Sequence, residues 1–586
     1  MRPAELSALR ANAATAKAWL VEGVWKVEHA FERSKAQGRV VDDTRLRICF
    51  VLALFGAAFV TLGIEAGRAA LFGKPSGSGE AVAPPPGARA DLVDREGRLL
   101  AVDLVHYGLY LDPRASWNLK ETRAKLLAAL PNLSRERLEK ALASDRREYL
   151  VGALTPAERE RVHDLGLPEV SFEEEQRRVY PVGESASHLI GFADSGGHGL
   201  AGAESALDPE VREAAAAGKP VALSIDLRVQ AALEDELRGI MRLHTPISAT
   251  GIVTNAKTGE VLALASLPDF NPNTAGQTPP ADLVNHAAAS VYEMGSTFKI
   301  FTFAMGLDSG VANVNSTFDA SEPLKIGDRT IHDYHGVNRV MSLEDVFIHS
   351  SNIGTAKLGL RAGGERLKRY FDAFGLLAPA RVELSESARP ILPRTWNEDV
   401  VASASFGAAI SVSPLAVAGG VGAVMNGGTY VPLTILKETA APKGRRVISP
   451  EASRAMLDLM RANVLRGTGT KADAPGLRVG GKTGSAEKAI GGRYERNKLV
   501  SSFAAVFPTD GPVDATRYVV LIMVDEPKGV KETFGFATGG WAAAPAAGRV
   551  IDRIAPFLGV RRTPTAPFAA QRQAAAPAEE VSEGTL

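Results

Sequence analysis

The chain has 586 residues, which at roughly 150 residues per domain predicts three to four structural units and excludes a small binding module. Lys plus Arg and Asp plus Glu both total 67, a formal net charge of +0, and this balance excludes nucleic acid as the main partner because a protein that follows phosphates carries a basic excess. The composition is 45% hydrophobic and 23% charged with one cysteine, Cys49, which excludes a wholly disordered chain, an intramolecular disulfide and a cysteine-based zinc site.

The first predicted element is a membrane anchor. Residues 48–64 read ICFVLALFGAAFVTLGI, 17 residues without a charge, and as a helix they would reach about 25 Å against a hydrocarbon core about 30 Å thick. The 47 residues before them hold nine Lys or Arg and six Asp or Glu, so the positive-inside rule puts residues 1–47 in the cytoplasm. We therefore expect an anchor over residues 48–72, with the rest of the chain outside. A buried core helix and a cleavable signal peptide are the alternatives.

A linker and a non-catalytic module should follow the anchor. Residues 73–88 contain PSGSGEAVAPPPG, the Gly, Ser and Pro composition of a spacer. Residues 89–220 combine short strand-like and helical pieces, including a charged helix around Ser134 to Arg147. This stretch is interpreted as a mixed α and β module.

A larger α+β domain is predicted over residues 221–562. It should start with a helix near Val221 and continue into a hairpin with residues 257–259 (KTG) at its tip. Near its end, SSFAAVFP and RYVVLIMVDEP are apolar, β-rich runs suited to central strands. Helices between strands that pair early and late in the sequence indicate one antiparallel sheet. The Ala-, Pro- and Gln-rich tail, residues 563–586, is predicted to be disordered.

A serine and a lysine one helical turn apart are the first candidates for chemistry. Ser296 opens the run STFKIFTFAMGL, which is apolar nearly all round and therefore predicts a buried helix. Positions i and i+3 share a helix face, so the Lys299 amine should lie beside the Ser296 hydroxyl. Burial lowers the pKa of a lysine and can make it a base near neutrality, and a helix N-terminus favours a developing oxyanion.

Two further motifs follow in the same domain. Residues 350–352 (SSN) supply a hydroxyl able to relay a proton and an amide able to hold a peptide group, and residues 482–485 (KTGS) put a cation and hydroxyls on a predicted strand. Each motif has a second match in the chain, at residues 485–488 (SAEK), 116–118 (SWN) and 257–259 (KTG). Only one choice sets all three in order within the larger domain, so we interpret that set as functional.

This ordered set resembles the motifs of the penicillin-binding serine acyltransferases. The resemblance covers about residues 89–560 and includes these flanking segments: 224–230 (SIDLRVQ), 259–263 (GEVLA) with Pro268 and Asn273, 426–428 (NGG) with Pro432, 501–503 (SSF), 539–540 (GG) and 544–545 (AP). In the first module, residues 94–97 (DREG), 180–181 (YP) and 202–204 (GAE) resemble the pedestal of class B members. The implied fold is a single transmembrane helix, a pedestal (dimerisation-type) domain and a serine β-lactamase-like transpeptidase domain, with an antiparallel sheet flanked by helices.

The resemblance implies a role for each motif residue. Ser296 would be the nucleophile, Lys299 its general base, Ser350 the relay that protonates the leaving amine, and Asn352 a group that orients the donor peptide. The third motif would bind the terminal carboxylate of a D-alanyl-D-alanine stem through Lys482, Thr483, Gly484 and Ser485. Backbone N–H groups of Ser296 and Ser485 would form the oxyanion hole.

The resemblance also implies an activity and a location. The expected activity is peptidoglycan D,D-transpeptidation, with β-lactam binding, in the periplasm beyond an inner-membrane anchor. The compact pedestal resembles the division-specific type, which implies a septal role with an FtsW-like glycosyltransferase and other division proteins as partners. An elongation-specific transpeptidase, a D,D-carboxypeptidase, a β-lactam-hydrolysing relative and a non-catalytic division scaffold remain alternatives.

No cofactor or metal is expected. His332 and His335 have a spacing that resembles a metal site, but a loop or hairpin is the favoured interpretation. The string at residues 344–349 (EDVFIH) departs from the glycosyltransferase signature of class A relatives in spacing and location, so glycan polymerisation is not expected.

Overall fold

The computed structural model describes residues 88–563 apart from 335, 439–441 and 492, together with scattered residues between 25 and 62. Side chains are not described at 490 and 496. The chain divides into two units, residues 1–83 and residues 84–586.

The first unit contains the predicted anchor. Its described residues are helical, and apolar side chains such as Val51, Phe55 and Phe59 are exposed. Among the described residues, no helix is both long enough and apolar enough to cross a membrane. The predictions for the linker, for the C-terminal tail and for most of residues 1–47 fall almost wholly outside the described residues.

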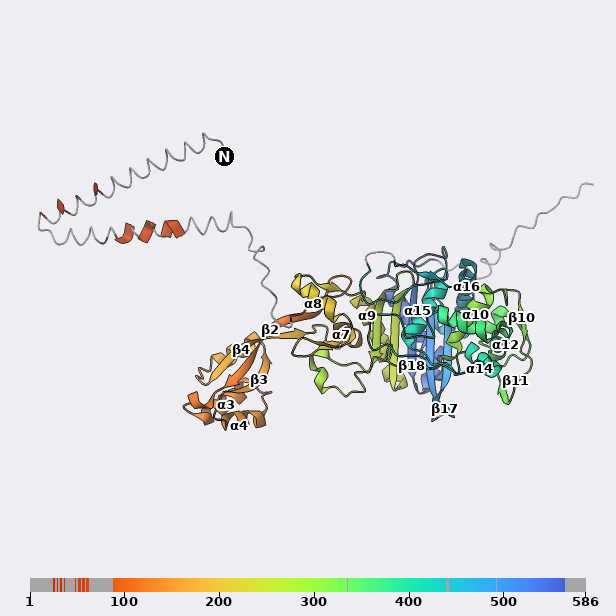
Figure 1. Ribbon diagram of the computed structural model, residues 1–586, viewed down its shortest axis with the longest axis horizontal. Helices are drawn as coiled ribbons and strands as arrows, with labels where there is room; N and C mark the ends of the chain where they lie inside the picture. The colour runs from red at the N-terminus through yellow and green to blue at the C-terminus, as the bar shows by residue number, and fades with distance from the viewer. Residues whose placement is uncertain are drawn as a thin grey trace, which may run out of the picture. The chain divides into compact units, whose positions relative to one another are not determined.

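The second unit begins with a module built on a five-stranded sheet in the order β3-β2-β1-β7, with β4 also paired to β2 (Figure 1). The strands are β1 (Leu92–Val93), β2 (Leu99–Leu111), β3 (Glu148–Leu154), β4 (Val170–Val179) and β7 (Val221–Ala222). Helices α3 (Leu119–Ala129), α4 (Arg135–Leu142) and α5 (Pro156–His163) accompany the long strands. Leu109, Leu126, Leu138 and Leu150 are fully buried in the core that strands and helices share.

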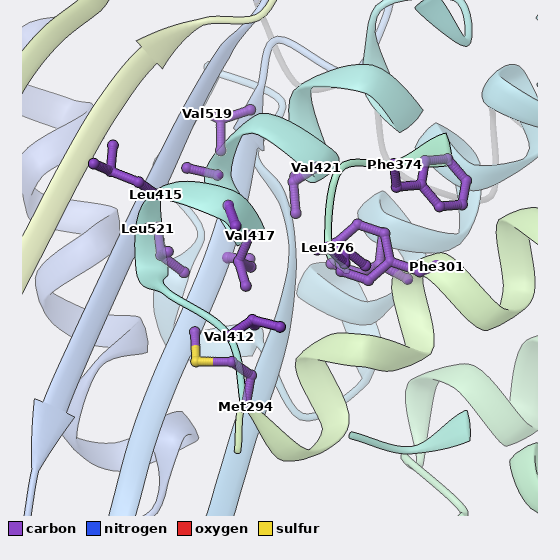
Figure 2. Close-up of a cluster of buried hydrophobic side chains, with 14 of the residues drawn as sticks. Met294, Phe301, Phe374, Leu376, Val412, Leu415, Val417, Val421, Val519 and Leu521 are labelled. Atoms are coloured by element: carbon purple, nitrogen blue, oxygen red, sulfur yellow. The ribbon is translucent and has the colours of Figure 1, made fainter. Parts of the chain in front are cut away.

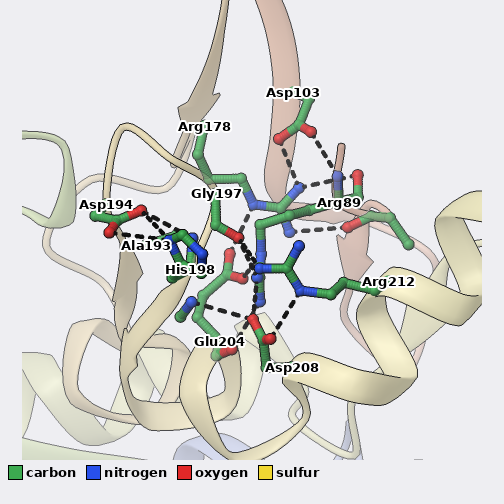
Figure 3. A network of polar contacts seen from close by, with 12 residues as sticks. Arg89, Asp103, Arg178, Ala193, Asp194, Gly197, His198, Glu204, Asp208 and Arg212 are labelled. Atoms are coloured by element: carbon green, nitrogen blue, oxygen red, sulfur yellow. Dashed lines mark hydrogen bonds and ion pairs between the residues drawn. The ribbon is translucent and has the colours of Figure 1, made fainter. Parts of the chain in front are cut away.

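A buried network of ion pairs stabilises the part of this module that contains Arg89, Arg178 and Glu204 (Figure 3). Glu204 accepts from Arg89 Nε at 2.7 Å and from Arg178 Nε at 2.6 Å. Asp103 accepts from Arg178 Nη1 at 3.1 Å and from the Arg89 backbone N–H at 2.8 Å, and Arg89 also pairs with Asp208. Each buried charge therefore has an opposite charge and hydrogen bonds, which is the condition for burying ions without a large penalty.

The first module also contains several short elements. They are 3₁₀ turn η1 (Pro113–Ala115), α6 (Ser187–Ile190), β5 (Phe192–Ala193), β6 (Gly199–Ala201), α7 (Gly202–Ala206) and α8 (Asp208–Ala216). Glu204 lies on α7 and belongs to residues 202–204 (GAE), one of the segments that resemble the class B pedestal. That segment therefore supplies the centre of the network.

Two predicted helices differ from those observed. The helix expected near Val221 begins instead at Leu227, because Asp226 caps it by accepting the Arg228 N–H at 2.9 Å, and β7 at 221–222 pairs with β1. The helix expected over 134–147 begins as predicted after Ser134, which accepts the Arg137 N–H, but ends at Leu142.

The larger domain is organised around a second five-stranded sheet, in the order β16-β17-β18-β8-β9, with every neighbouring pair antiparallel. Its strands are β8 (Ser248–Asn255), β9 (Val261–Leu267), β16 (Gly480–Ile490), β17 (Arg493–Phe507) and β18 (Tyr518–Asp525). The early hairpin β8–β9 thus meets strands formed more than two hundred residues later. The prediction of one antiparallel sheet from early and late strands is confirmed.

Two apolar cores lie on opposite faces of this sheet. In β18, Val520, Ile522 and Val524 belong to the core under α9 (Leu227–His244) and α18 (Ala544–Ile554). The alternating residues Val519, Leu521 and Met523 belong to the other core, which includes α10 (Lys299–Asp308) and α15 (Pro414–Met425) (Figure 2). Because successive strand residues point to opposite faces, a strand buried on both faces is continuously apolar in sequence.

The larger domain contains further short strands, helices and 3₁₀ turns. They are η2 (Pro272–Gln277), η3 (Gly295–Phe298), β10 (Thr317–Asp319), β11 (Leu324–Ile326), β12 (Arg329–Ile331), β13 (Val340–Ser342), α11 (Leu343–Ile348), α12 (Asn352–Ala362), α13 (Gly364–Ala373), α14 (Glu398–Ser405), β14 (Thr429–Tyr430), β15 (Arg445–Arg446), α16 (Pro450–Arg466), η4 (Thr470–Ala472), η5 (Lys531–Thr533) and α17 (Gly539–Ala542). Helix α10 is buried nearly all round, as its sequence predicts.

Candidate active site

Ser296 lies in the 3₁₀ turn η3, which continues directly into α10. The preceding Gly295 has a φ of +52°, and a Cβ there would come within 2.7 Å of the Ser485 carbonyl oxygen. Gly407, which accepts the Gly295 N–H at 3.1 Å, would clash in the same way with the Gly295 backbone. Glycine is therefore required at both positions for the turn that carries Ser296, the predicted nucleophile, to approach its neighbours. We call this turn the nucleophile turn.

Lys299 follows one turn later and is completely buried. Its Nζ donates to the Ser350 carbonyl at 2.5 Å, to Ser350 Oγ at 3.1 Å and to Asn352 Oδ1 at 2.9 Å. Burial lowers the pKa of Lys299 well below its usual 10.5, and the charge of Lys482 lowers it further. The structure therefore joins the first two motifs through this amine. In the described part of the chain we find no hydrogen bond to the Ser296 hydroxyl itself.

Ser350 stands between two buried lysines. It occupies the turn between α11 and α12 with a φ of +59°, a backbone conformation that is unfavourable for a serine and typical of functional sites. Its Oγ accepts from Lys299 and, at 2.9 Å, from Lys482 Nζ. One hydroxyl thus connects all three motifs, which are separated widely in sequence.

Lys482 is also completely buried. It lies on β16, where its Nζ is within hydrogen-bond reach of the Thr483 carbonyl at 3.2 Å as well as Ser350 Oγ. Burial lowers the pKa of Lys482 to about 7. At neutral pH this amine therefore exchanges between charged and neutral forms, and an incoming anion would favour the charged form.

The other residues of the third motif lie on the same strand. Thr483 Oγ1 is 2.7 Å from Thr468 Oγ1, and Ser485 Oγ, on an exposed residue, accepts the Gly539 N–H at 3.0 Å. A Cβ on Gly484 would come within 2.5 Å of the Met294 carbonyl and 2.4 Å of Thr297 Oγ1. The glycine of this motif therefore allows the strand to lie against the nucleophile turn.

The second copies of the motifs serve other purposes. Lys257, at the tip of the β8–β9 hairpin, donates to the Asp514 carbonyl at 3.1 Å. Asn118 accepts the Glu121 N–H as the cap of α3, and Lys488 pairs with Asp525 at 2.9 Å and Glu526 at 3.0 Å. None of these residues is near Ser350 in the hydrogen-bond network of the described chain.

Comparison with known proteins agrees with this geometry. A family model described as the penicillin-binding protein transpeptidase domain matches residues 249–552, and one described as the penicillin-binding protein dimerisation domain matches residues 84–210. The chain belongs to the class B penicillin-binding proteins.

Individual relatives span most of the chain. The probable peptidoglycan D,D-transpeptidase FtsI of Caulobacter vibrioides is 58% identical over 553 residues, covering 93% of this chain and 94% of the relative. The probable peptidoglycan D,D-transpeptidase PenA of Neisseria gonorrhoeae is 30% identical over 83% of this chain and 87% of its own length. The peptidoglycan D,D-transpeptidase FtsI of Escherichia coli K12 is 30% identical over 80% and 83%.

One residue that supports this candidate site was not found from the sequence. Asp333 accepts from Ser351 Oγ at 2.7 Å, from the Asn352 N–H at 2.6 Å and from the Ile353 N–H at 3.0 Å. It therefore stabilises the N-terminus of α12, which is part of the second motif. Asp333 itself lies in a loop, 17 residues before Ser350 in the sequence. No local spacing links the two, so only the tertiary structure reveals this contact.

The loop that carries Asp333 was the one considered for metal binding. His332 contributes its backbone carbonyl, which accepts Asn352 Nδ2 at 3.2 Å, and His335 lies outside the described residues. Across the residues that the structure describes, no group of His, Cys, Asp and Glu side chains is arranged to hold a metal ion.

Asp333→Ala should slow the reaction of this protein with a fluorescent penicillin by at least about tenfold, because Ser350 and Asn352 lose their support. Loss of the hydrogen bonds that Asp333 accepts at the N-terminus of α12 should also cost about 0.5–2 kcal/mol of stability. The matched control is Ser449→Ala, which removes the hydroxyl that caps α16 by accepting the Ala452 N–H. Both variants should melt at a lower temperature, but equal labelling rates in the two would contradict a specific role for Asp333.

Proposed function

We propose that this protein is a peptidoglycan D,D-transpeptidase that cross-links stem peptides through an acyl-enzyme on Ser296. The single observation that carries the proposal is the Ser350 hydroxyl, which accepts hydrogen bonds from two buried lysines, Lys299 at 3.1 Å and Lys482 at 2.9 Å. A proton path between nucleophile and leaving group is what acyl transfer from an amide requires. The relatives named as D,D-transpeptidases support the same reaction.

In the acylation step, Ser296 Oγ attacks the carbonyl carbon of the penultimate D-alanine. Lys299, whose pKa burial lowers, takes the hydroxyl proton as the carbon–oxygen bond forms. The proton passes through Ser350 to the nitrogen of the terminal D-alanine, the amide bond breaks and D-alanine leaves. Asn352 and the residues of the third motif, Lys482, Thr483, Gly484 and Ser485, would hold the donor peptide and its carboxylate.

The strand β16 offers a place for the developing oxyanion. It is the edge strand of its sheet, and the Ser485 carbonyl faces Gly295 of the nucleophile turn. In a strand the N–H and C=O of one residue point to the same side, so the Ser485 N–H faces that turn as well. We therefore assign the oxyanion hole to the backbone N–H groups of Ser296 and Ser485.

In the second step, an amine of a neighbouring stem peptide attacks the ester carbon of the acyl-enzyme. The new amide bond forms, the bond to Ser296 Oγ breaks, and the proton released by the amine returns to the serine oxygen through the same lysine and serine groups. A β-lactam would acylate Ser296 in the first step and remain there.

For the cellular role, we propose synthesis of the division septum. Residues 48–64 would anchor the protein in the inner membrane with residues 1–47 in the cytoplasm and the catalytic domain in the periplasm. An FtsW-like glycosyltransferase and other division proteins would be its partners. The name FtsI of the relatives supports the division role over the elongation role.

Ser296→Ala should abolish covalent labelling by a fluorescent penicillin, because no acyl-enzyme can form without the hydroxyl. Ser485→Ala should retain labelling, because it keeps the backbone N–H and loses only the hydroxyl that accepts from Gly539. The labelled band would be read on a denaturing gel, and retention by the first variant with loss by the second would reverse the assignment.

The rate of labelling should rise by clearly less than tenfold per pH unit between about pH 8 and pH 10. A base with the usual lysine pKa of about 10.4 would become about tenfold more reactive per pH unit through that range. Because burial lowers the pKa of Lys299 well below that of an ordinary lysine, its neutral form becomes available at a lower pH. In the empty site the charged form of Lys482 declines above a pKa of about 7, which weakens carboxylate binding. A steady tenfold rise per unit to pH 10 would contradict this mechanism.

A fluorescently tagged full-length chain should concentrate at midcell in dividing cells. Fluorescence microscopy of cells at known stages of division measures this directly. Even labelling of the side wall, without a midcell band, would support the elongation-specific alternative and leave the transpeptidase chemistry intact.

A further inference from the structure

The segment that leads into the nucleophile turn is paired with a distant loop. Tyr292 and Val412 exchange two backbone hydrogen bonds of 3.0 Å each, and the Gly295 N–H donates to the Gly407 carbonyl at 3.1 Å. The strip 292–295 and the loop 407–412 therefore lie side by side immediately before Ser296.

Glu293 closes this arrangement with its side chain. The carboxylate accepts the Ala409 N–H at 2.9 Å, and Ala409 has a φ of +64°, which an alanine rarely adopts without support. In the described part of the chain Glu293 forms no ion pair. Half-burying a carboxylate without a partner cation costs free energy. The hydrogen bonds that Glu293 accepts from the loop and from one further group offset that cost.

That further group is Tyr494, near the tip of the β16–β17 hairpin. Its hydroxyl lies 3.2 Å from both Glu293 oxygens. Burial and the charge of Glu293 raise the pKa of Tyr494 to about 12, so the phenol stays protonated and donates. Midway along β16 of the same hairpin, Ser485 lies against Gly295. The nucleophile segment is thus held to the hairpin at two points, one at Gly295 and one at Glu293.

Several charged groups face this contact. Burial raises the pKa of Glu293, while the hydrogen bonds from Ala409 and Tyr494 and the charge of Arg329 oppose the rise. Arg329, on β12, is itself paired with Asp399 at 3.4 Å, and Glu487, on β16, acts on Tyr494. Tyr494 is therefore the direct hydrogen-bond donor from the hairpin, and Arg329 acts at longer range.

We propose that Glu293 is a positioning residue for acylation, which holds the Ser296 turn and strand β16 at the spacing that the two oxyanion-hole N–H groups require. It acts through the Ala409 N–H on one side and the Tyr494 hydroxyl on the other. The inference rests on the proposed function. It adds a residue outside the three motifs, and it gives the hairpin tip a role in the rate of the chemical step.

The test measures covalent labelling of the full-length protein by a fluorescent penicillin over a range of concentrations. This separates the binding constant, the acylation rate constant and the final labelled fraction. Tyr494→Phe should lower the acylation rate constant about tenfold, the effect of one hydrogen bond to a charged acceptor, while the binding constant and final labelled fraction stay unchanged. Glu293→Ala should lower it at least as much.

Two further variants distinguish positioning from general stability. Glu293→Gln keeps an amide oxygen that can accept from both partners, so its rate should stay within about threefold of the wild type. The Glu293→Ala, Tyr494→Phe double variant should be no slower than Glu293→Ala alone, because both changes break the same contact. Glu495→Gln is the matched control on the same hairpin, where it breaks an ion pair with Lys498, and it should react at the wild-type rate.

The proposal would be overturned if the rate losses of the two single variants multiplied in the double variant. It would also be overturned if the single variants lowered the final labelled fraction and left the acylation rate constant unchanged, because that result would indicate misfolding. A rate loss in Glu495→Gln equal to that in Tyr494→Phe would also overturn it. Absence of labelling in the wild-type protein would instead overturn the proposed function, so the two failures are distinguishable.

Discussion

The site depends on burying two lysine side chains around one serine hydroxyl. Lys299 and Lys482 have no exposed surface, and both donate to Ser350 Oγ. Both amines lose their hydration in this dry site, so their pKa values fall, and the charge of Lys482 lowers the pKa of Lys299 further. The apolar surroundings of α10 are therefore part of the chemistry, since they convert an ordinary cation into a group that can accept a proton.

The close approach of backbones is the second condition for this site. Gly295 and Gly484 bring the nucleophile turn and strand β16 together where any side chain would clash. The edge position of β16 leaves one side of the strand free of sheet hydrogen bonds, so it can face a substrate. Asp333 and Glu293 then support the second motif and the nucleophile segment from loops outside the three motifs.

The two modules use buried charge in opposite ways. In the first module, Arg89 and Arg178 meet Glu204 and Asp103 at hydrogen-bond distances, so opposite charges remain ionised and fix the geometry. In the described part of the catalytic domain, neither Lys299 nor Lys482 has a carboxylate partner. Their charge is consequently easy to lose, which is useful for proton transfer and unhelpful for stability.

Much of this protein could be predicted from sequence because the decisive signals are local. The run STFKIFTFAMGL specifies a buried helix with serine at its start, and RYVVLIMVDEP specifies a strand covered on both faces. The order of the three motifs identified the family and separated them from their second copies. The start of α9 and the end of α4 were less predictable. Helix caps and the pairing of neighbouring residues with distant strands decide where a helix begins and ends.

The sequence by itself determined which residues are the candidates for the chemistry, since residue type and order along the chain are enough to single out a serine, a lysine and the two motifs that follow them. Only the tertiary structure decided how they are connected. Lys299 hydrogen-bonds to Ser350 and Asn352, and Asp333 and Glu293 act on segments that follow no spacing rule. Contacts between loops far apart in the chain depend on how the sheet and α10 pack, and that packing leaves no periodic signature in the sequence.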